Sequence, residues 1–407
     1  EGMIQAVMST LLNTECVLHV EGVTKAVKMR QGSAQGTSLG PVLCLYFMLP
    51  ILNLWHDKIQ KEHTTTFVDT ADGTAEVKTS LNNFADDTMM VVGSETEVRK
   101  LVRAFTEYIE SFQVKLHKKT SRFPGKASKS VVVYVPAKFD PTAPLKEDIF
   151  IRETPEGDIE TIQFVKSCVY LGAKITNDLT DVAEITGRMV KASQMFGMLR
   201  RDMLASKDTW PEVKKRILEG MIIPTMLDGA EHWVVGADQR RELNSLFNRM
   251  VRSCLRMTIY TTRKYHITTQ ATHEKIGVGN LDHYLDLRVL GYAGHVERMG
   301  PERLPKILRD SYLVLPQKRG RPIRSQQDQV RDALKRKKIG LLEWKTLARN
   351  RTKWREAIRE PPVYATKCKP HAEWTKSPDS LIGCLVEKQF GHKWHSGEIT
   401  ESDIDID

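Results

Sequence analysis

The sequence predicts an α+β fold, in which strands with covering helices come first and a mostly helical part follows. Two short runs that suit β-strands, 81–84 and 88–92, flank the acidic pair Asp86-Asp87. The run 95–112 carries its apolar residues on one helical face, so it predicts an amphipathic helix that covers the sheet carrying this pair. From Val182 onward, apolar residues recur at steps of three and four, which is typical of packed helices.

Composition and charge favour a partner that is a polyanion. The chain has 407 residues, enough for roughly two to four domains. Its formal net charge is +10 and its pI about 9.2, which favours nucleic acid. A membrane surface is the rival partner, but no apolar stretch is long enough to span a bilayer.

Six scattered cysteines without a CxxC pair indicate reduced thiols. Together with the lack of a visible signal peptide, they predict an intracellular protein, nuclear or cytoplasmic. Because the chain opens on Glu1 rather than Met, we expect it to be a fragment.

Asp86 and Asp87 stand where a hairpin turn is expected, and two adjacent carboxylates repel each other there. A divalent cation relieves this repulsion, and Mg²⁺ prefers a few carboxylate oxygens together with substrate phosphates. Paired Mg²⁺ ions stabilise the attacking and leaving oxygens of an in-line phosphoryl transfer. The alternative is a plain hairpin turn with two solvated acids.

A loop rich in glycine and small polar residues, 28–40, precedes an apolar helix predicted over 41–59. Gly and Ser let a backbone approach a sugar or a phosphate closely. Pro41 suits the first turn of the helix, which we expect to be buried on most sides. The alternative is a loop that merely starts a core helix.

The two motifs together resemble the palm of a reverse transcriptase of the non-LTR (LINE-type) retrotransposon family. They are Gln35-Gly36-x-x-Leu39-Gly40-Pro41 and, after the apolar helix, Phe84-Ala85-Asp86-Asp87. The resemblance implies an RNA-directed DNA polymerase, a nucleotidyltransferase that extends a DNA primer on an RNA template with dNTPs. It implies metal binding, of Mg²⁺ or Mn²⁺, by Asp86 and Asp87. The residues that it places against the incoming nucleotide and the template are Gln35, Gly36, Leu39 and Phe84.

The third metal-binding carboxylate of the family has no counterpart here. In the family it lies upstream of the Gln-Gly loop, in an aromatic-rich context that none of Glu1, Glu15 and Glu21 has. The fingers subdomain would lie upstream as well. A two-metal site without one ligand is weak, so we expect little or no polymerase activity from this chain alone. The alternative function is a non-catalytic remnant that binds nucleic acid.

The family also has a short Asn-x-x-Lys-Thr-like segment that supplies a lysine near the triphosphate. Lys119 is the best match, in the segment 114–120, although Leu116 stands where Asn is usual. Such a lysine acts as a charge clamp or as a proton donor. The alternative is a solvated basic turn.

A buried strand is predicted over 130–136. The segment 164–175 resembles the strand that leads from palm to thumb, in which Gly172 permits close approach to the primer. Three helices follow, and their basic faces suit a thumb that grips A-form duplex. The alternative is a helical bundle with ordinary solubilising charges. Arg188 and Lys191 lie opposite the apolar seam of the first helix, and Arg249, Arg252 and Arg256 line one face of the third.

The segment Gly294-His295-Val296-Glu297-Arg298-Met299 closely resembles one in the C-terminal region of these elements. We expect His295 to be a hydrogen-bonded structural residue. The region 318–359 is the most basic of the chain, so we expect nucleic-acid contact there first. Trp344 and Trp354 either stack on bases or pack inward. The basic residues predicted to bind nucleic acid are Lys318, Arg319, Arg321, Lys335, Arg336, Lys337 and Lys338.

Two interpretations of the tail stay open. Cys368, His371, Cys384, His392 and His395 have steps that suit zinc ligands. The stretch 381–399 instead resembles the first two strands of a small Tudor- or SH3-like barrel. The predicted domains are a partial palm over 1–180, a helical thumb over 181–260, a basic nucleic-acid-binding region over 261–360 and the tail over 361–407.

Overall fold

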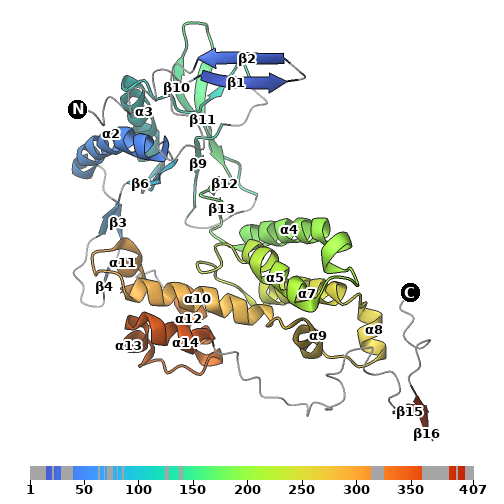
Figure 1. The fold of residues 1–407 in the computed structure, drawn as a ribbon. Coiled ribbons are helices and arrows are strands. Elements are labelled where there is room, and N and C mark those ends of the chain that lie inside the picture. Colours follow the sequence, from blue (N-terminus) through green and yellow to red (C-terminus); the bar gives the residue numbers. More distant parts are fainter. Residues whose placement is uncertain are drawn as a thin grey trace, which may run out of the picture. The chain divides into compact units, whose positions relative to one another are not determined.

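The computed structural model describes residues 15–20, 23–28, 40–62, 65–67, 69–70, 77–79, 81–84, 87–123, 128–136, 140, 142–312, 325–359, 385–390 and 393–398. Figure 1 shows a mixed α+β chain, as the sequence predicts. The chain divides into two compact units. The first comprises 1–134 and 143–165, and the second comprises 135–142 and 166–407.

The first unit is built on two helices, α2 (Gly40–Glu62) and α3 (Glu95–Ser111). Trp55 of α2 packs edge-on against Phe105 of α3, with ring centroids 5.2 Å apart. The hydroxyl of Tyr108 on α3 donates to a main-chain carbonyl of α2 at 2.9 Å. Burial of aromatic rings, which carry the largest apolar surfaces, therefore fixes one helix on the other.

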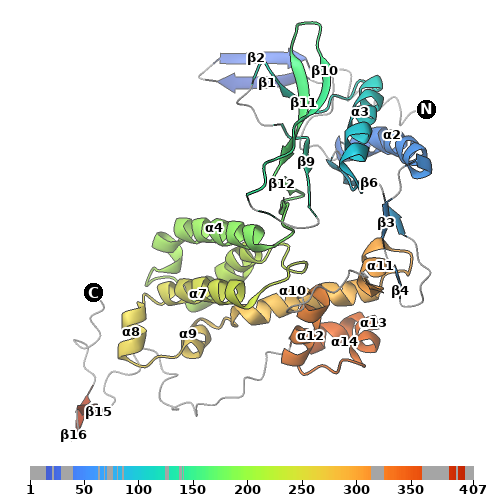
Figure 2. The same ribbon diagram turned by 180° about the vertical axis from the view of Figure 1, so that it is seen from behind.

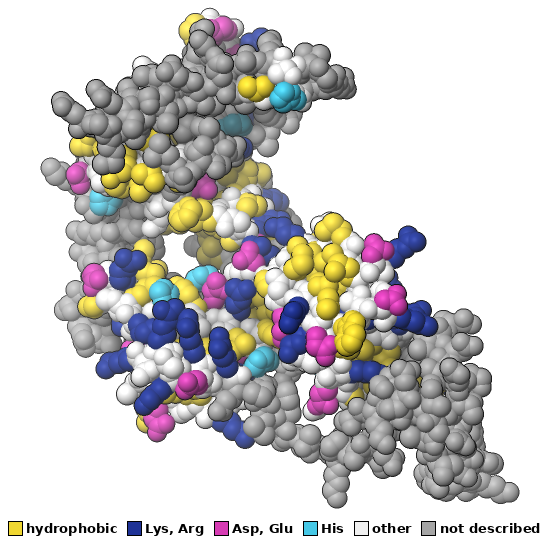
Figure 3. Space-filling view, viewed as in Figure 1, with side chains coloured by type: hydrophobic (Ala, Val, Ile, Leu, Met, Phe, Trp, Pro, Cys, Tyr) yellow, Lys and Arg dark blue, Asp and Glu magenta, His cyan; other side chains and the backbone are white. Residues whose placement is uncertain are grey.

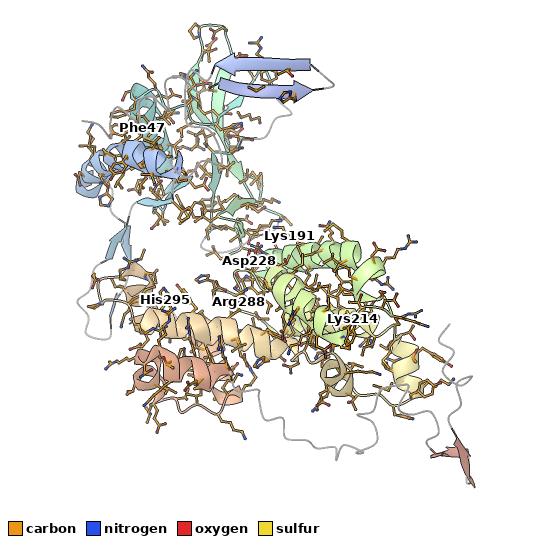
Figure 4. The ribbon with its side chains drawn as sticks, in the orientation of Figure 1. Phe47, Lys191, Lys214, Asp228, Arg288 and His295 are labelled. Atoms are coloured by element: carbon orange, nitrogen blue, oxygen red, sulfur yellow. The ribbon has the colours of Figure 1, made fainter. Side chains whose placement is uncertain are left out.

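α2 buries one face only, so the prediction that it is buried on most sides is wrong. The buried face consists of Met48, Ile51, Leu52 and Trp55. The rest of the helix carries exposed apolar side chains such as Tyr46 and Phe47, of which Figure 4 labels Phe47.

The other face of α3 covers a four-stranded sheet, in which the antiparallel order is β10-β11-β8 and β9 runs parallel to β11. Ile149, Ile162 and Phe164 of the sheet pack against Val98 and Val102 of α3. The prediction of an amphipathic helix is therefore confirmed, but the four-stranded sheet that it covers is not the sheet of the acidic pair, as was predicted. The four strands are β8 (Lys119–Thr120), β9 (Val131–Val133), β10 (Ile149–Glu153) and β11 (Ile159–Val165).

The other strands of this unit are short and form hairpins or ladders of two strands. β1 pairs antiparallel with β2, β3 with β5, and β6 with β7. They are β1 (Glu15–Val20), β2 (Val23–Lys28), β3 (Thr65–Phe67), β4 (Asp69–Thr70), β5 (Val77–Thr79), β6 (Leu81–Phe84) and β7 (Asp87–Met90).

In the second unit, a tight hairpin precedes the helices, where one continuous strand was predicted. β12 (Ser167–Tyr170) and β13 (Ala173–Thr176) are joined by Leu171 and Gly172. Both have positive φ, 48° and 82°, which is the backbone that a two-residue hairpin turn requires and that Gly adopts most readily. Gly172 therefore has a structural reason to be glycine.

Helices make up most of the second unit, and its core is continuous. The buried residues from Ile185 to Ile358 form one cluster, so the regions predicted as a thumb and as a basic region share a core. α7 buries the predicted face, including Leu243, Phe247 and Met250. The helices in this part are α4 (Val182–Leu199), η1 (Arg200–Leu204), α5 (Pro211–Ile217), η2 (Leu218–Ile222), α6 (Ile223–Met226), α7 (Ala237–Cys254), α8 (Ile259–Lys264), α9 (Thr269–Ile276) and α10 (Leu281–Glu297).

The helices that follow α10 in the chain pack on it, and Figure 1 and Figure 2 show them beside it from opposite sides. Trp344 and Trp354 are both buried there, with centroids 6.1 Å apart, which confirms that the tryptophans pack inward. The elements after α10 are α11 (Leu304–Asp310), β14 (Ser311–Tyr312), α12 (Gln326–Arg336), α13 (Trp344–Arg349) and α14 (Arg351–Arg359).

Packing explains most of the segment 294–299. Arg298 donates to the carbonyl of Ala348 at 2.6 Å, and the buried carboxylate of Glu297 pairs with Arg309 at 2.7 Å. His295 is exposed and has no hydrogen bond to any residue that the structure describes, so the prediction of a hydrogen-bonded structural histidine is wrong (Figure 4).

In the tail, β15 (Leu385–Phe390) and β16 (Lys393–Glu398) form an antiparallel pair. Two strands are also what the barrel interpretation predicts at this point. Of the five candidate zinc ligands, Cys368, His371, Cys384 and His392 lie outside the described residues, and the side chain of His395 is not described. Among the helices that the structure describes, none has the length and apolarity to cross a membrane.

Candidate functional site

The acidic pair lies at the end of the β6–β7 hairpin. Phe84 pairs with Asp87 in the ladder. In the next pair, Thr88 Oγ1 donates a hydrogen bond to Asn83 Oδ1 at 2.8 Å. Asp87 opens β7 with an exposed side chain, and Phe84 is 65% exposed. Asp86 lies outside the described residues, between these two paired positions. The hairpin therefore presents Asp87 to solvent.

The strand that follows Asp87 is anchored in the core of the first unit. Met90 and Val92 pack against the cluster formed by α2 and α3. These contacts fix the end of the hairpin that is farther from the turn. The other end, which carries the carboxylate, is free of this packing. The hairpin is therefore supported by the core of the first unit at one end and is polar at its turn.

The predicted loop before α2 lies outside the described residues, and with it Gln35, Gly36 and Leu39. The structure resumes at Gly40, the first residue of α2, and Pro41 stands in its first turn as predicted. Pro there costs no hydrogen bond, because the first amides of a helix have no partner within the helix.

Lys119 lies in β8, and its Nζ is 3.6 Å from Asp148 Oδ2. Its side chain is about a third exposed, so the amine has only one loose partner among the described residues. β8 belongs to the sheet on one face of α3, whereas Met90 of the hairpin packs in the cluster on the other. α3 thus supports both elements that carry predicted catalytic residues.

Its neighbour Lys118 has a structural role. Lys118 pairs with Glu110 and Glu160, which also pair with Arg152. Burial acts to raise the pKa of Glu110, but the two cations outweigh it and hold that pKa below its ordinary value. Of two adjacent lysines, one is therefore fixed in a network and the other is accessible.

Arg188 is buried, so the prediction that it lies on an outer basic face is wrong. Its guanidinium pairs with Glu184 at 2.6 Å and with Asp228 at 2.5 Å, and it donates to the carbonyl of Gly172 at 2.8 Å. This arginine joins the β12–β13 hairpin to α4. Lys191, one turn further along α4, is exposed and accessible to a ligand (Figure 4).

Lys214 of α5 is a second basic residue that does not lie on the surface. It is buried, and its Nζ donates to the carbonyl of Cys254 at 3.0 Å. Burial lowers the pKa of its amine.

The basic residues at the end of α12 have divided roles. Arg336 binds Asp286 through two hydrogen bonds of 2.8 and 2.7 Å, which fixes α12 on α10. Lys337 Nζ is 3.0 Å from His283 Nδ1. Lys335 and Lys338 are exposed. Of the four residues predicted to bind nucleic acid here, Arg336 and Lys337 are therefore held in contacts within the second unit, whereas Lys335 and Lys338 are exposed.

Figure 3 shows that Lys and Arg side chains gather on the helices from α10 to α14. Exposed residues of α14 such as Arg351, Lys353 and Arg355 contribute to this charge. Burial and the nearby charges of Arg351 and Arg355 lower the pKa of Arg298. Lys318, Arg319 and Arg321 lie outside the described residues.

Sequence reasoning missed a polar stripe along α7. Asn244, Ser245 and Asn248 line an open groove with arginines before and after them. The available signal was the spacing of these polar residues on the helix side opposite Leu243 and Phe247.

No protein-family model matches the chain, and comparison with curated proteins and with solved structures likewise found no match. Among the residues that the structure describes, no three His, Cys, Asp or Glu side chains gather as a metal site. Since Asp86 is outside those residues, this does not bear on the acidic hairpin.

Proposed function

We propose that this chain is the C-terminal part of a reverse transcriptase of the non-LTR retrotransposon type. Its first unit is then a partial palm, and its second unit binds primer–template. The observation that carries the proposal is the acidic hairpin, in which Asp87 opens a strand anchored on α2 and α3. The order of motifs supports it too, because the Gln-Gly loop, α2 and this hairpin follow one another as in that family.

The donor set at the hairpin suits Mg²⁺ or Mn²⁺. Adjacent carboxylates supply the hard oxygen ligands that these ions prefer. Asp86 and Asp87 are the residues that would hold them, and the ions when bound supply charge neutralisation at the transferred phosphate. The exposed position of Asp87 leaves its oxygens without a hydrogen-bond partner among the described residues, so both stay available as ligands.

Lys119 is the proposed cation at the triphosphate. Its partner Asp148 lies 3.6 Å away, a loose contact that an incoming phosphate displaces readily. A positioned ammonium stabilises charge on a leaving pyrophosphate or donates a proton to it. Phe84, exposed beside Asp87, offers an apolar ring to the substrate.

The experiment is metal-dependent dNTP incorporation on a primed RNA template. We would compare this chain with a version extended upstream through its reading frame, each also as Asp86→Ala and Asp87→Ala. Asp57→Ala, which removes an exposed carboxylate of α2, is the matched control. Incorporation by the extended version that both hairpin substitutions abolish and the control keeps supports the proposal. Activity that survives Asp86→Ala overturns it.

The second candidate is a nucleic-acid-binding remnant without catalysis. It is favoured by the net charge of +10 and by exposed cations such as Lys191, Lys335 and Lys338. An extended version that binds duplex with a steep salt dependence and yet incorporates no nucleotide supports this candidate instead.

A further inference from the structure

An open groove of about 610 Å³ runs along α7 in the second unit. Most of its lining residues form a stripe of α7, and Ile259 at the start of α8 and Asp282 in the first turn of α10 complete it. At about 1.5 Å per residue, the stripe is roughly 22 Å long. Its residues are Ala237, Arg240, Arg241, Asn244, Ser245, Asn248 and Arg252.

Two kinds of surface line this groove. Most of the area is apolar, since Ala237, the exposed side chain of Ile259 and the aliphatic stems of the arginines contribute to it. The guanidinium groups at the ends of those stems and the amides of Asn244 and Asn248 add hydrogen-bond donors among the apolar atoms. A matching ligand therefore carries apolar groups and charged acceptors close together.

Among the described residues, Arg252 is the arginine of this lining that has no carboxylate partner. Arg240 pairs with Asp282 at 2.5 Å, so the carboxylate in the lining is already neutralised. Arg241 pairs with Asp238. Burial and a neighbouring arginine lower the pKa of Arg252. A half-buried cation without a counter-charge is costly, and a carboxylate placed in the groove removes that cost.

The last residues of the sequence have the chemistry that this lining matches. The segment 399–407 carries four carboxylates and neither Lys nor Arg, in a chain whose formal net charge is +10. Within it, the run Ser402-Asp403-Ile404-Asp405-Ile406-Asp407 alternates Asp with Ile. Alternation places the carboxylates on one side of an extended backbone and the isoleucines on the other. These residues lie outside the part of the chain that the structure describes.

The length of this segment and its connection to the second unit also fit. Extended from 402 to 407, it spans about 20 Å, close to the roughly 22 Å of the stripe. The link from Arg359 at the end of α14 to Ser402 is far longer than the groove at about 3.3 Å per residue. An intramolecular ligand binds at an effective concentration set by its link rather than by the protein concentration, so a modest affinity is enough to fill the groove.

We propose that the acidic segment 402–407 of this chain binds in the groove along α7, with a carboxylate on Arg252 and its isoleucines against Ala237 and Ile259. The arginine then donates charge-assisted hydrogen bonds, and apolar surface of the groove is removed from water. The bound segment excludes other ligands from the groove. This contact within the chain goes beyond the proposed function and does not depend on it.

The test is fluorescence anisotropy with a labelled peptide of residues 399–407 added to the full chain. The comparison is with a neutralised chain, which is the full chain with Asp403→Asn, Asp405→Asn and Asp407→Asn together. Its groove is expected to be open, whereas the groove of the unchanged chain is occupied by its own segment. The peptide should therefore bind the neutralised chain at least about tenfold more tightly than the unchanged chain.

Substitutions in the neutralised chain locate the peptide. Arg252→Gln should weaken binding of the peptide about tenfold. Arg216→Gln removes an exposed arginine of α5 outside the groove lining and is the matched control, with an expected change of less than about twofold. Ser245→Glu places a carboxylate in the groove, and Ser193→Glu places one on the exposed face of α4. Only the first glutamate should weaken binding strongly.

A second peptide tests the apolar half of the contact. It carries Asn in place of Ile404 and Ile406 and keeps all four carboxylates. It should bind the neutralised chain at least about fivefold more weakly, because less apolar surface is buried.

Equal affinity of the first peptide for the unchanged and the neutralised chain overturns the proposal. So does equal loss from the two arginine variants or from the two glutamates, or undiminished binding of the second peptide. A dimer of the unchanged chain that dissociates on neutralisation, measured by sedimentation, also overturns it, because the segment then lies on a second copy. Nucleotide incorporation is no part of these measurements, so failure of the proposed polymerase leaves their outcome unchanged.

Discussion

The indole of Trp354 on α14 lies directly against Gly294 on α10. A Cβ at position 294 would stand 2.1 Å from Trp354 Nε1, a distance that no side chain tolerates. The same nitrogen donates to the carbonyl of Leu290 at 3.0 Å. Gly294 is thus the residue that lets α14 approach α10 closely enough for the buried indole to bind its backbone.

Gly294→Ala should therefore destabilise the second unit by about 2–3 kcal/mol, because a rigid buried ring has to move. Gly291→Ala, one turn earlier on the same helix, is the matched control. Apart from its chain neighbours and its own helix, no atom of the described residues lies within 4 Å of a Cβ there, so this change should stabilise slightly through helix propensity, by up to about 1 kcal/mol. Denaturant unfolding measures both, and equal midpoints for the two variants contradict the packing described.

Arg188→Leu should cost about 3 kcal/mol in the free energy of unfolding, since the buried Glu184 then loses its cation. Lys191→Leu removes an exposed cation from the same helix and should change stability by less than about 0.5 kcal/mol. Chemical denaturation compares the two. If Arg188→Leu left the free energy of unfolding unchanged, the network with Asp228 would contribute nothing to folding.

Adjacent lysines of the first unit should respond in opposite ways. Lys118→Met leaves two carboxylates with Arg152 alone and should lower stability by about 2 kcal/mol. Lys119→Met should leave the unfolding midpoint nearly unchanged and should lower nucleotide incorporation by the extended version. The prediction fails if Lys119→Met unfolds as readily as Lys118→Met, or if only Lys118→Met affects incorporation.

His283 should make the second unit sensitive to acid. Burial, reinforced by the charge of Lys337, lowers the pKa of His283 to about 4, below its ordinary value of about 6.5. The unfolded chain then binds the proton more readily than the folded chain, so stability falls as the pH drops from about 6.5 toward 4. Melting temperatures over this range test it.

In the same measurement, His283→Gln should show a shallower loss of melting temperature between pH 7 and pH 5 than the unchanged chain. His295→Gln is the control, because that imidazole is exposed on the same helix. Parallel pH curves for the unchanged chain and His283→Gln would contradict the assignment.

The sequence by itself determined the α+β class and much of the helical pattern. The apolar spacing that predicted α3 and α7 places Leu101 and Phe105, or Leu243 and Phe247, in the cores where they are found. This works because a helix repeats every 3.6 residues, so burial of one face is written into local spacing. It also favoured inward packing of Trp354, because a large apolar ring at helical spacing gains most from burial.

Only the tertiary structure decided which basic residues are free to bind a ligand. Arg188 and Arg336 are as basic in sequence as Lys191 and Lys335, yet their partners Asp228 and Asp286 lie 40 and 50 residues away along the chain. Spacing within one helix carries no information about such partners, because ion pairing depends on which elements meet. For the same reason, spacing did not predict the α7 groove, whose wall is completed by residues of α8 and α10. Nor did it predict the close contact between Gly294 and Trp354.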